Sequence, residues 1–211
     1  MLTLKAVRII KNCDIITAPK TKNNNIAFDI VKDSTDINNK EIVLFDFPMT
    51  KDKKITSENY IKIAKQIETF LDNGKNVAML TLGDVSIYST CSYILDIVKA
   101  DGYDIEIIPG IPSFCSIAAK LKISLTSMEK PIHIIVPLHD NLDESLMLEG
   151  TKIFMKAGKF IKQIKEKVIN LRKHAFVVVN CGLENEKVFE SIEEVNIEDK
   201  FEYFTTIVVK D

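Results

Sequence analysis

The stretch Gly83-Asp84-Val85-Ser86-Ile87-Tyr88-Ser89-Thr90 decides the fold because of what stands on either side of it. The preceding residues 77–82 form a continuous apolar run of the kind that parallel strands bury on both faces, and residues 93–98 repeat apolar side chains at helical spacing. A strand, a short polar loop and a helix in this order predict an α/β sheet, which binds ligands at such loops. Gly83 would let a ligand approach the backbone closely, although a plain helix-capping loop explains the same residues.

A second loop of similar composition, Pro109-Gly110-Ile111-Pro112-Ser113, follows a predicted strand over residues 104–108. Ser113 is a good cap for the helix that we expect over residues 113–121. If the two loops follow neighbouring strands, they line one crevice together. An ordinary turn between two elements is the alternative. The stiff Pro-Gly-Ile-Pro segment also suits a hinge between domains.

The remaining periodicity predicts alternating helices and strands along the chain. We expect helices over residues 2–10, 26–31, 57–73, 93–101, 113–121 and 160–171. We expect strands over residues 14–16, 41–47, 77–82, 104–108, 132–136, 152–156, 175–180 and 201–209. Ser57 is expected to cap the third helix. The pattern predicts two α/β domains, residues 1–110 and 111–211, each with a mostly parallel or mixed sheet flanked by helices.

Composition and charge narrow the functional classes. The 211 residues are 46% apolar and 27% charged, and the net charge of −2 argues against a broad surface that neutralises nucleic-acid phosphates. No apolar run approaches the roughly 20 residues that span a bilayer, and the N-terminus does not resemble an export signal. We therefore expect a cytoplasmic protein without nucleic-acid or membrane partners.

The cysteines and histidines do not indicate metal or disulfide chemistry. The four cysteines are far apart and lie in or beside apolar stretches, which favours reduced structural thiols. His133 and His139 do not have the spacing of a compact pair of metal ligands. We expect no protein-bound metal.

Several segments, taken in order, resemble the tetrapyrrole methylase family. The loop at residues 83–90 is similar to the family's G-D-P loop, and residues 109–115 are similar to its interdomain segment. Further matching segments are Phe47-Pro48-Met49-Thr50, Met155-Lys156-Ala157-Gly158-Lys159, Cys181-Gly182-Leu183 and Tyr203-Phe204. The two loops most resemble the subgroup that methylates C-20 of precorrin-2 or cobalt-precorrin-2 in cobalamin biosynthesis.

Two departures from the family pattern stand out. Val85 stands where the family usually has proline, which should loosen that turn but leaves Gly83 and Asp84 in place. Members of the family begin with a strand that ends in a G-x-G-x-G-D-P loop, and this chain begins at the following segment, Leu2-Thr3-Leu4-Lys5-Ala6. We therefore expect the first strand of the first domain to be missing, through a misplaced start codon or a trimmed chain.

The resemblance implies an S-adenosylmethionine-dependent C-methyltransferase that holds its cofactor in a cleft between the two domains and releases S-adenosylhomocysteine. The cofactor contacts that it implies are Leu82, Gly83, Asp84, Ile87, Ser89, Thr90, Pro112, Ser113, Met155 and Gly182. The acceptor carbon of the macrocycle is already nucleophilic, so we expect alignment rather than a strong base to drive the transfer. Catalytic residues stay unassigned, with Asp84 and Tyr88 as candidates for orienting groups.

The implied tetrapyrrole substrate carries many carboxylates, so basic side chains should line its side of the cleft. The candidates are Lys51, Lys53 and Lys54, followed by Lys156 and Lys159. Ordinary solvated lysines explain each of these positions equally well. The resemblance also implies a homodimer, and it leaves open whether the substrate carries cobalt.

Other functions stay open. Within the family, the acceptor could be another corrin position, the diphthamide side chain of a translation factor, or ribosomal RNA, which the mild acidity disfavours. The chain could also be a non-catalytic remnant that binds a ligand. A nucleotide-dependent oxidoreductase is disfavoured, because no G-x-G-x-x-G follows a predicted strand.

Overall fold

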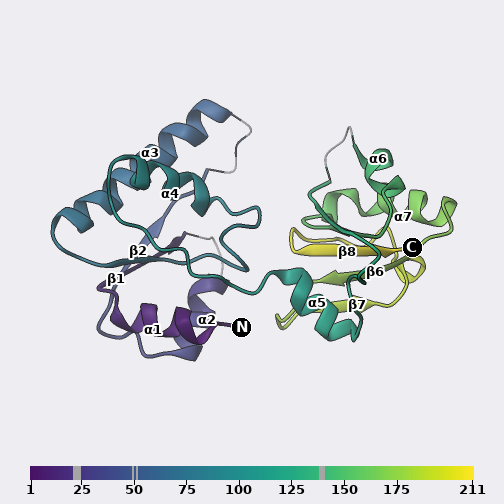
Figure 1. The fold of residues 1–211 in the computed structure, drawn as a ribbon, viewed down its shortest axis with the longest axis horizontal. Coiled ribbons are helices and arrows are strands. Elements are labelled where there is room, and N and C mark those ends of the chain that lie inside the picture. The colour runs from purple at the N-terminus through teal and green to yellow at the C-terminus, as the bar shows by residue number, and fades with distance from the viewer. Residues whose placement is uncertain (21–24, 49, 51, 138–140) are drawn as a thin grey trace. The chain divides into compact units, whose positions relative to one another are not determined.

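The structure, a computed structural model, describes residues 1–20, 25–48, 50, 52–137 and 141–211, and Figure 1 shows its helices and strands. The chain divides into two compact units, Met1–Pro112 and Ser113–Asp211. Each unit has its own sheet with helices packed against it. The predicted α/β fold with two sheets is therefore confirmed.

In the described residues, the first unit is built on a three-stranded parallel sheet with the strand order β2-β1-β3. Its elements are α1 (Leu4–Asn12), β1 (Ile15–Pro19), α2 (Ile26–Ser34), β2 (Glu41–Phe45), α3 (Lys53–Asp72), β3 (Val77–Met79) and α4 (Cys91–Ala100). Ile15 of β1 pairs with Glu41 of β2 on one side and with Val77 of β3 on the other. A helix lies in each connection between these strands, as parallel neighbours require.

Two layers of helices cover the two faces of this sheet (Figure 1). On one face, α1 and α2 bring Ile10 and Val31 against Ile16 of β1. On the other face, α3 and α4 bring Ile67 and Ile94 into a second core. The chain crosses the sheet in one direction from β1 to β2 and returns past β1 to reach β3. Right-handed crossovers then place α2 and α3 on opposite faces.

Two expectations for the middle of the first unit are wrong in detail. The strand expected over residues 41–47 ends at Phe45, and it is an edge strand in which Phe45 is buried and the other residues are at least partly exposed. The helix that Ser57 was expected to cap begins one turn earlier, at Lys53. Asp52 is its cap, since a carboxylate oxygen of Asp52 accepts two backbone N–H groups of the first turn, the nearer at 2.8 Å.

The structure places residues 104–108 outside the sheets, so the prediction of a strand there is wrong. Among the described residues, no strand pairs with the second edge of β3, and β3 itself ends at Met79 rather than at Leu82. Residues 104–108 form no hydrogen-bond ladder with β3 or with any other described strand. The side chains of Tyr103 and Ile105 nevertheless pack on the core beneath α3 and α4, which holds this segment against the first unit.

The second unit contains a mixed sheet with the strand order β4-β5-β8-β6-β7. Its elements are α5 (Ser113–Leu121), β4 (Ile132–Ile135), α6 (Leu142–Met147), β5 (Thr151–Phe154), the short 3-10 helix Gly158–Phe160, α7 (Ile161–Asn170), β6 (His174–Val179), β7 (Lys187–Phe189), the 3-10 helix Ile192–Glu194 and β8 (Thr205–Lys210). β4 and β5 are parallel, and the other neighbouring pairs are antiparallel. Helices α6 and α7 pack on one face around Phe154 and Ile164, and Ile117 of α5 packs on the other.

A group of charged side chains, Lys152, Lys173 and Asp211, connects the ends of three central strands of this second sheet. Lys152 of β5 is fully buried, and its ammonium lies 2.5 Å from Asp211 Oδ1 and donates to the Leu148 carbonyl at 3.0 Å. Asp211 also accepts from Lys173 Nζ at 2.5 Å and from the Gly150 N–H at 2.6 Å. Burial alone would raise the pKa of Asp211, but the hydrogen bonds from both lysines hold this pKa below its ordinary value.

Asp211→Asn should lower the free energy of unfolding by about 3 kcal/mol, because Lys152 would keep a buried charge without its counter-ion. Urea denaturation followed by circular dichroism measures the change. Asp199→Asn, at an exposed position, is the control, and its effect should stay below about 0.5 kcal/mol. Since the pKa of Asp211 is depressed, the contribution is present above the ordinary aspartate pKa and is lost as the pH falls through the lowered value. Equal effects of the two substitutions would contradict the assignment.

Candidate functional site

The loop after β3 and the segment after residue 108 meet through two glycines. The N–H of Gly110 donates to Asp84 Oδ2 at 2.8 Å. A Cβ atom on Gly110 would lie 1.9 Å from the carbonyl oxygen of Gly83, so glycine alone fits at position 110. Gly83 has a φ of +76°, in the left-handed region that glycine adopts without strain. The structure thus brings the two loops of the sequence analysis into direct backbone contact.

The Asp84 carboxylate holds this contact together. Its Oδ1 accepts from the N–H of Ser86 at 2.8 Å and from the Ser86 hydroxyl at 2.5 Å, while Oδ2 accepts from Gly110. The hydroxyl of Ser86, its N–H and the N–H of Gly110 lower the pKa of Asp84. Asp84 is therefore ionised at neutral pH, and it acts as a clamp between the loops rather than as a base.

Ser89 shapes the start of α4. Its hydroxyl lies 3.2 Å from the hydroxyl of Thr81 and accepts the N–H of Cys91 at 3.3 Å. Its carbonyl accepts from the Ser92 hydroxyl at 2.8 Å. The Ser89 hydroxyl, expected as a cofactor contact, is thus already engaged in forming the loop. Thr90 at the N-cap position is exposed.

The same loop presents apolar side chains at its surface. Leu82 is 38% exposed and Tyr88 is 48% exposed, while Ile87 is half-buried. Tyr88 has a φ of +49°, which is unfavourable for a bulky residue and persists when surrounding structure enforces it. The loop therefore combines bare glycine backbone, a carboxylate and apolar surface within a few residues.

In the second unit, Met155 and Gly182 lie at one edge of the sheet. β5 and β6 both run antiparallel to β8, so they are parallel to each other and their carboxyl ends share an edge. Met155 directly follows β5, and Gly182 follows shortly after β6. Lys156 and Asn180, at the same two strand ends, have φ values of +57° and +53°. Both strands therefore end in tight turns at the edge where ligands of such sheets bind.

Glu186 fixes the loop that contains Gly182, although no motif in the sequence singles this residue out. Its carboxylate accepts the Gly182 N–H at 2.6 Å and lies 2.8 Å from the ammonium of Lys120 in α5. The hydrogen bond from Lys120, followed by that from Gly182, lowers the pKa of Glu186. The acidic run Glu184-Asn185-Glu186 was the available signal, but it does not show which carboxylate turns towards the loop.

The remaining predicted residues are spread over the two units. Pro112 and Ser113 fall on either side of the division, and Ser113 is the first residue of α5 rather than its cap. Lys53 and Lys54 are exposed in the first turn of α3, and Lys51 lies outside the described residues. That residues of both units contact one cofactor stays a prediction.

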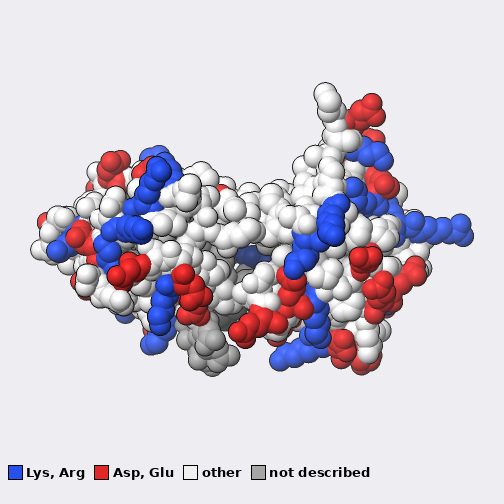
Figure 2. All heavy atoms as spheres, turned by 90° about the horizontal axis from the view of Figure 1, so that it is seen from below, with Lys and Arg blue, Asp and Glu red and all other residues white. Residues whose placement is uncertain are grey.

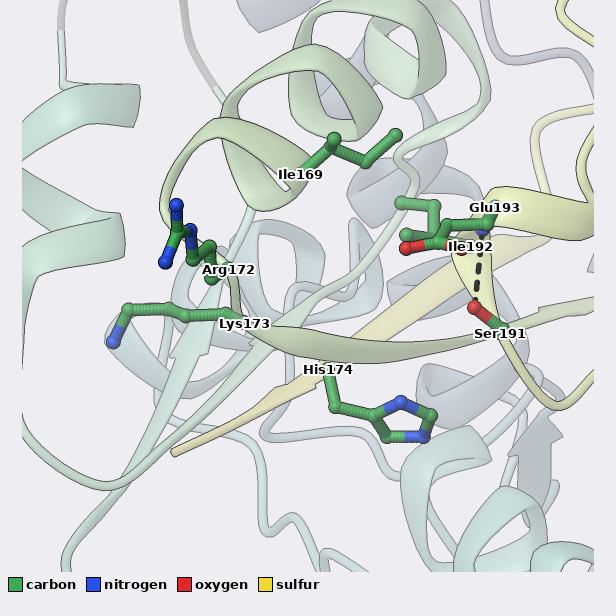
Figure 3. A pocket seen from close by; sticks show the side chains of 7 residues that line it. All are labelled: Ile169, Arg172, Lys173, His174, Ser191, Ile192 and Glu193. Atoms are coloured by element: carbon green, nitrogen blue, oxygen red, sulfur yellow. Dashed lines mark hydrogen bonds between the residues drawn. The ribbon is translucent and has the colours of Figure 1, made fainter.

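A pocket in the second unit lies away from these residues. It is lined by Ile169, Arg172, Lys173, His174, Ser191, Ile192 and Glu193. His174 is the first residue of β6, so this pocket lies at the amino end of the strand whose carboxyl end leads to Gly182. Figure 3 shows the side chains of Arg172 and Lys173 directed to one side and that of His174 to another. They do not converge on a common ligand position.

The surface shown in Figure 2 mixes lysine and arginine with aspartate and glutamate. In the described part of the chain, no helix is long and apolar enough to cross a membrane. Within the same residues, no group of three or more His, Cys, Asp or Glu side chains is placed to hold a metal ion.

Comparison with proteins of known sequence gives relatives along the whole chain. A probable cobalt-precorrin-2 C(20)-methyltransferase from Methanocaldococcus jannaschii is 31% identical, over 100% of this chain and 90% of the relative. A cobalt-precorrin-2 C(20)-methyltransferase from Salmonella typhimurium is 26% identical, over 99% and 90%. A diphthine synthase from Metallosphaera sedula is 30% identical over 67% of this chain and 52% of its own.

Solved structures share the fold. A cobalt precorrin-4 methyltransferase superposes with a TM-score of 0.74 at 16% identity, covering 99% of this chain and 88% of that one. A uroporphyrin-III C-methyltransferase from Thermus thermophilus, complexed with S-adenosylhomocysteine, superposes with a TM-score of 0.67 at 16% identity, covering 99% and 85%. The family described as Tetrapyrrole (Corrin/Porphyrin) Methylases matches residues 1–196. With its two α/β units and its glycine-locked loops, this chain is a methyltransferase that belongs to the tetrapyrrole methylase family.

Proposed function

We propose that this member of the family transfers a methyl group from S-adenosylmethionine to C-20 of precorrin-2 or cobalt-precorrin-2. Alignment over essentially the whole chain with two relatives named for that position supports the choice of acceptor. The structural observation that carries the proposal is the contact between Gly83, Asp84 and Gly110, which fixes a bare backbone loop at the carboxyl end of a parallel strand.

The residues present fit a cofactor that needs close approach to the main chain. Gly83 is exposed, and the nearest atoms to a Cβ there would be Ile111 O and Pro112 Cα, both at 3.9 Å. For Gly182, no described atom lies within 4 Å of that position. The ionised Asp84 places negative charge beside Gly83, which suits a ligand with a positive sulfonium.

When bound, the cofactor supplies an activated methyl group on its sulfonium. The residues of this chain then have to orient that group against the acceptor carbon and exclude water, because the meso carbon is itself nucleophilic. Leu82 and Ile87 supply apolar surface, and Asp84 holds the two loops together through its hydrogen bond from Gly110. We assign Asp84 a positioning role, since its oxygens already accept hydrogen bonds from Ser86 and Gly110.

Asp84→Asn should weaken the binding of S-adenosylhomocysteine by about tenfold, because the amide NH2 group replaces one of the two oxygens that accept from Ser86 and from Gly110. Isothermal titration calorimetry measures the affinity. The control is Asp96→Asn, an exposed position on α4, which should bind like the wild type. Wild-type affinity in Asp84→Asn would remove this residue from the site. A wild type that does not bind would count against the proposed function itself.

The lowered pKa of Asp84 predicts how the same binding depends on pH. The ionised form is favoured by hydrogen bonds, so the clamp is intact above the ordinary aspartate pKa and is lost as the pH falls through the lowered folded-state value. Affinity for S-adenosylhomocysteine should thus hold through the ordinary aspartate pKa of about 4 and decline only at the lower pH at which Asp84 takes up a proton. Calorimetry on Asp84→Asn should show no decline from this cause. An identical decline in wild type and variant would assign it to another group.

Glu186→Gln tests whether the second unit contributes to the cofactor site. Loss of the negative charge should loosen the loop around Gly182 and weaken S-adenosylhomocysteine binding by about fivefold. Glu184→Gln, two residues away and exposed, is the matched control and should have no effect. If both variants bind alike, the loop with Gly182 lies outside the cofactor site.

The second candidate function is methylation of the diphthamide side chain, which the partial likeness to a diphthine synthase supports. Incubation with S-adenosylmethionine and either cobalt-precorrin-2 or the unmethylated translation factor distinguishes the two. Methylation at C-20 supports the proposal, and methylation of the translation factor alone overturns it. Cofactor binding without transfer to either acceptor would identify a ligand-binding remnant. Homodimerisation and a cytoplasmic location stay predictions of the family resemblance.

A further inference from the structure

Three aromatic side chains of the first unit form a continuous row, here called the aromatic ledge: Phe47, Tyr60 and Tyr93. The rings of Phe47 and Tyr60 have centroids 6.3 Å apart and are tilted by 53°. The rings of Tyr60 and Tyr93 are 5.4 Å apart and nearly parallel, at 7°. The three residues come from three parts of the chain, namely the segment after β2, the helix α3 and the helix α4.

The aromatic ledge is not simply part of the core. Tyr93 is 58% exposed and Phe47 and Tyr60 are half-buried, whereas Ile63 and Ala64 on the inner side of α3 are buried. Burial, and secondarily the neighbouring Tyr93, raises the pKa of Tyr60. Its phenol is thus neutral at physiological pH. A stacked pair of neutral rings with one side open to solvent offers a flat apolar surface to another conjugated system.

The aromatic ledge lies at the edge of the sheet that carries the cofactor loop. Phe47 follows the carboxyl end of β2, and the loop of residues 83–90 follows the carboxyl end of β3. Both strands are parallel to β1, so these two ends share one edge. Tyr93 stands in the first turn of α4, directly after that loop. The ledge and the loop are therefore neighbours within the first unit.

Basic side chains stand along the same helix as the ledge. Lys53 and Tyr60 are seven residues apart in α3, which places them on one face, about 10 Å apart along the helix axis. Lys54 is exposed beside Lys53, with Glu58 4.0 Å from its ammonium. The Asp52 carboxylate caps the amino end of α3, so Lys53 and Lys54 supply the positive charge here. This end of the ledge is thus complementary to carboxylates.

We propose that the aromatic ledge stacks against the conjugated face of the tetrapyrrole while Lys53 binds one of its peripheral carboxylates. The exposed ring of Tyr93, stacked on Tyr60, together with the positive charge of Lys53 matches the chemistry of a conjugated macrocycle that carries carboxylates on its rim. The inference rests on the proposed function, because it takes the methyl acceptor as the occupant. It makes Tyr93 and Lys53 determinants of substrate affinity and leaves cofactor affinity to the glycine loops.

Tyr93→Leu tests the ledge, because it removes the ring but keeps apolar bulk at an exposed position. Uroporphyrin, a planar tetrapyrrole with carboxylate side chains, is titrated into the protein in the presence of S-adenosylhomocysteine and followed by the shift of its main absorption band. Tyr93→Leu should bind it about tenfold more weakly than the wild type. Tyr93→Phe should restore binding, because stacking needs the ring and not the hydroxyl. Ile61→Ala, an exposed apolar position on α3, is the control.

Lys53→Gln tests the charged end. Binding of uroporphyrin should weaken about threefold at low salt, and the difference should shrink at high ionic strength, where exposed charges are screened. Lys62→Gln is the matched control, since nine residues along α3 place Lys62 on the face opposite to Lys53. A substitution at Lys62 should leave the titration unchanged. Equal effects of the two lysine variants would overturn the assignment of Lys53.

The measurements separate failure of the ledge from failure of the proposed function. Calorimetry with S-adenosylhomocysteine should give the same affinity for wild type, Tyr93→Leu and Lys53→Gln. If the wild type methylates cobalt-precorrin-2 while Tyr93→Leu binds uroporphyrin as tightly as the wild type, the ledge is overturned and the function stands. If Tyr93→Leu loses uroporphyrin binding but the wild type transfers no methyl group, the ledge stands and the proposed function fails.

Discussion

The contact between Gly110 and Gly83 is the constraint on which the candidate site depends. The two backbones approach so closely that a single additional carbon at position 110 would collide with a carbonyl oxygen, and the Asp84 carboxylate spans the contact. In most α/β sheets a neighbouring strand would position the second loop through its hydrogen-bond ladder. Here residues 104–108 lie outside the sheets, so one carboxylate and a pair of glycines set the relation between the two loops. Apolar packing of Tyr103 and Ile105 supplies the rest.

In the second unit, charged side chains likewise join segments at both ends of the central strands. At the amino ends of the parallel strands, Lys152 and Asp211 join strands far apart in sequence. At the carboxyl ends, Glu186 connects the loop around Gly182 to Lys120 in α5. Each carboxylate has its pKa lowered by the cations and N–H groups around it. In both units, ionised carboxylates therefore hold the loops at the strand ends in place, while apolar side chains pack the faces of the sheets.

The sequence was sufficient to predict the α/β class and the two loops, because continuous apolar runs and glycines in the connecting loops are local signals. It was insufficient where the outcome depends on distant partners. Residues 104–108 have the pattern of a strand, yet whether such a segment pairs depends on where the rest of the fold places it, which no local pattern reveals. The choice between Asp52 and Ser57 as helix cap is also ambiguous, since both residue types cap well. Glu186 was missed because its role depends on Lys120, which is distant in sequence.

The unpaired edge of β3 also bears on how the protein behaves in solution. In the described residues, one side of Val77–Met79 pairs with β1, and the backbone N–H and C=O groups of the other side have no strand beside them. The strand is apolar and contains neither the proline nor the inward-pointing charge with which natural sheets discourage pairing between molecules. Its shortness limits the number of bonds that an incoming strand can form. This short edge of β3 is therefore one place in the first sheet where a strand of another molecule would pair, unless the side chains around it block the approach.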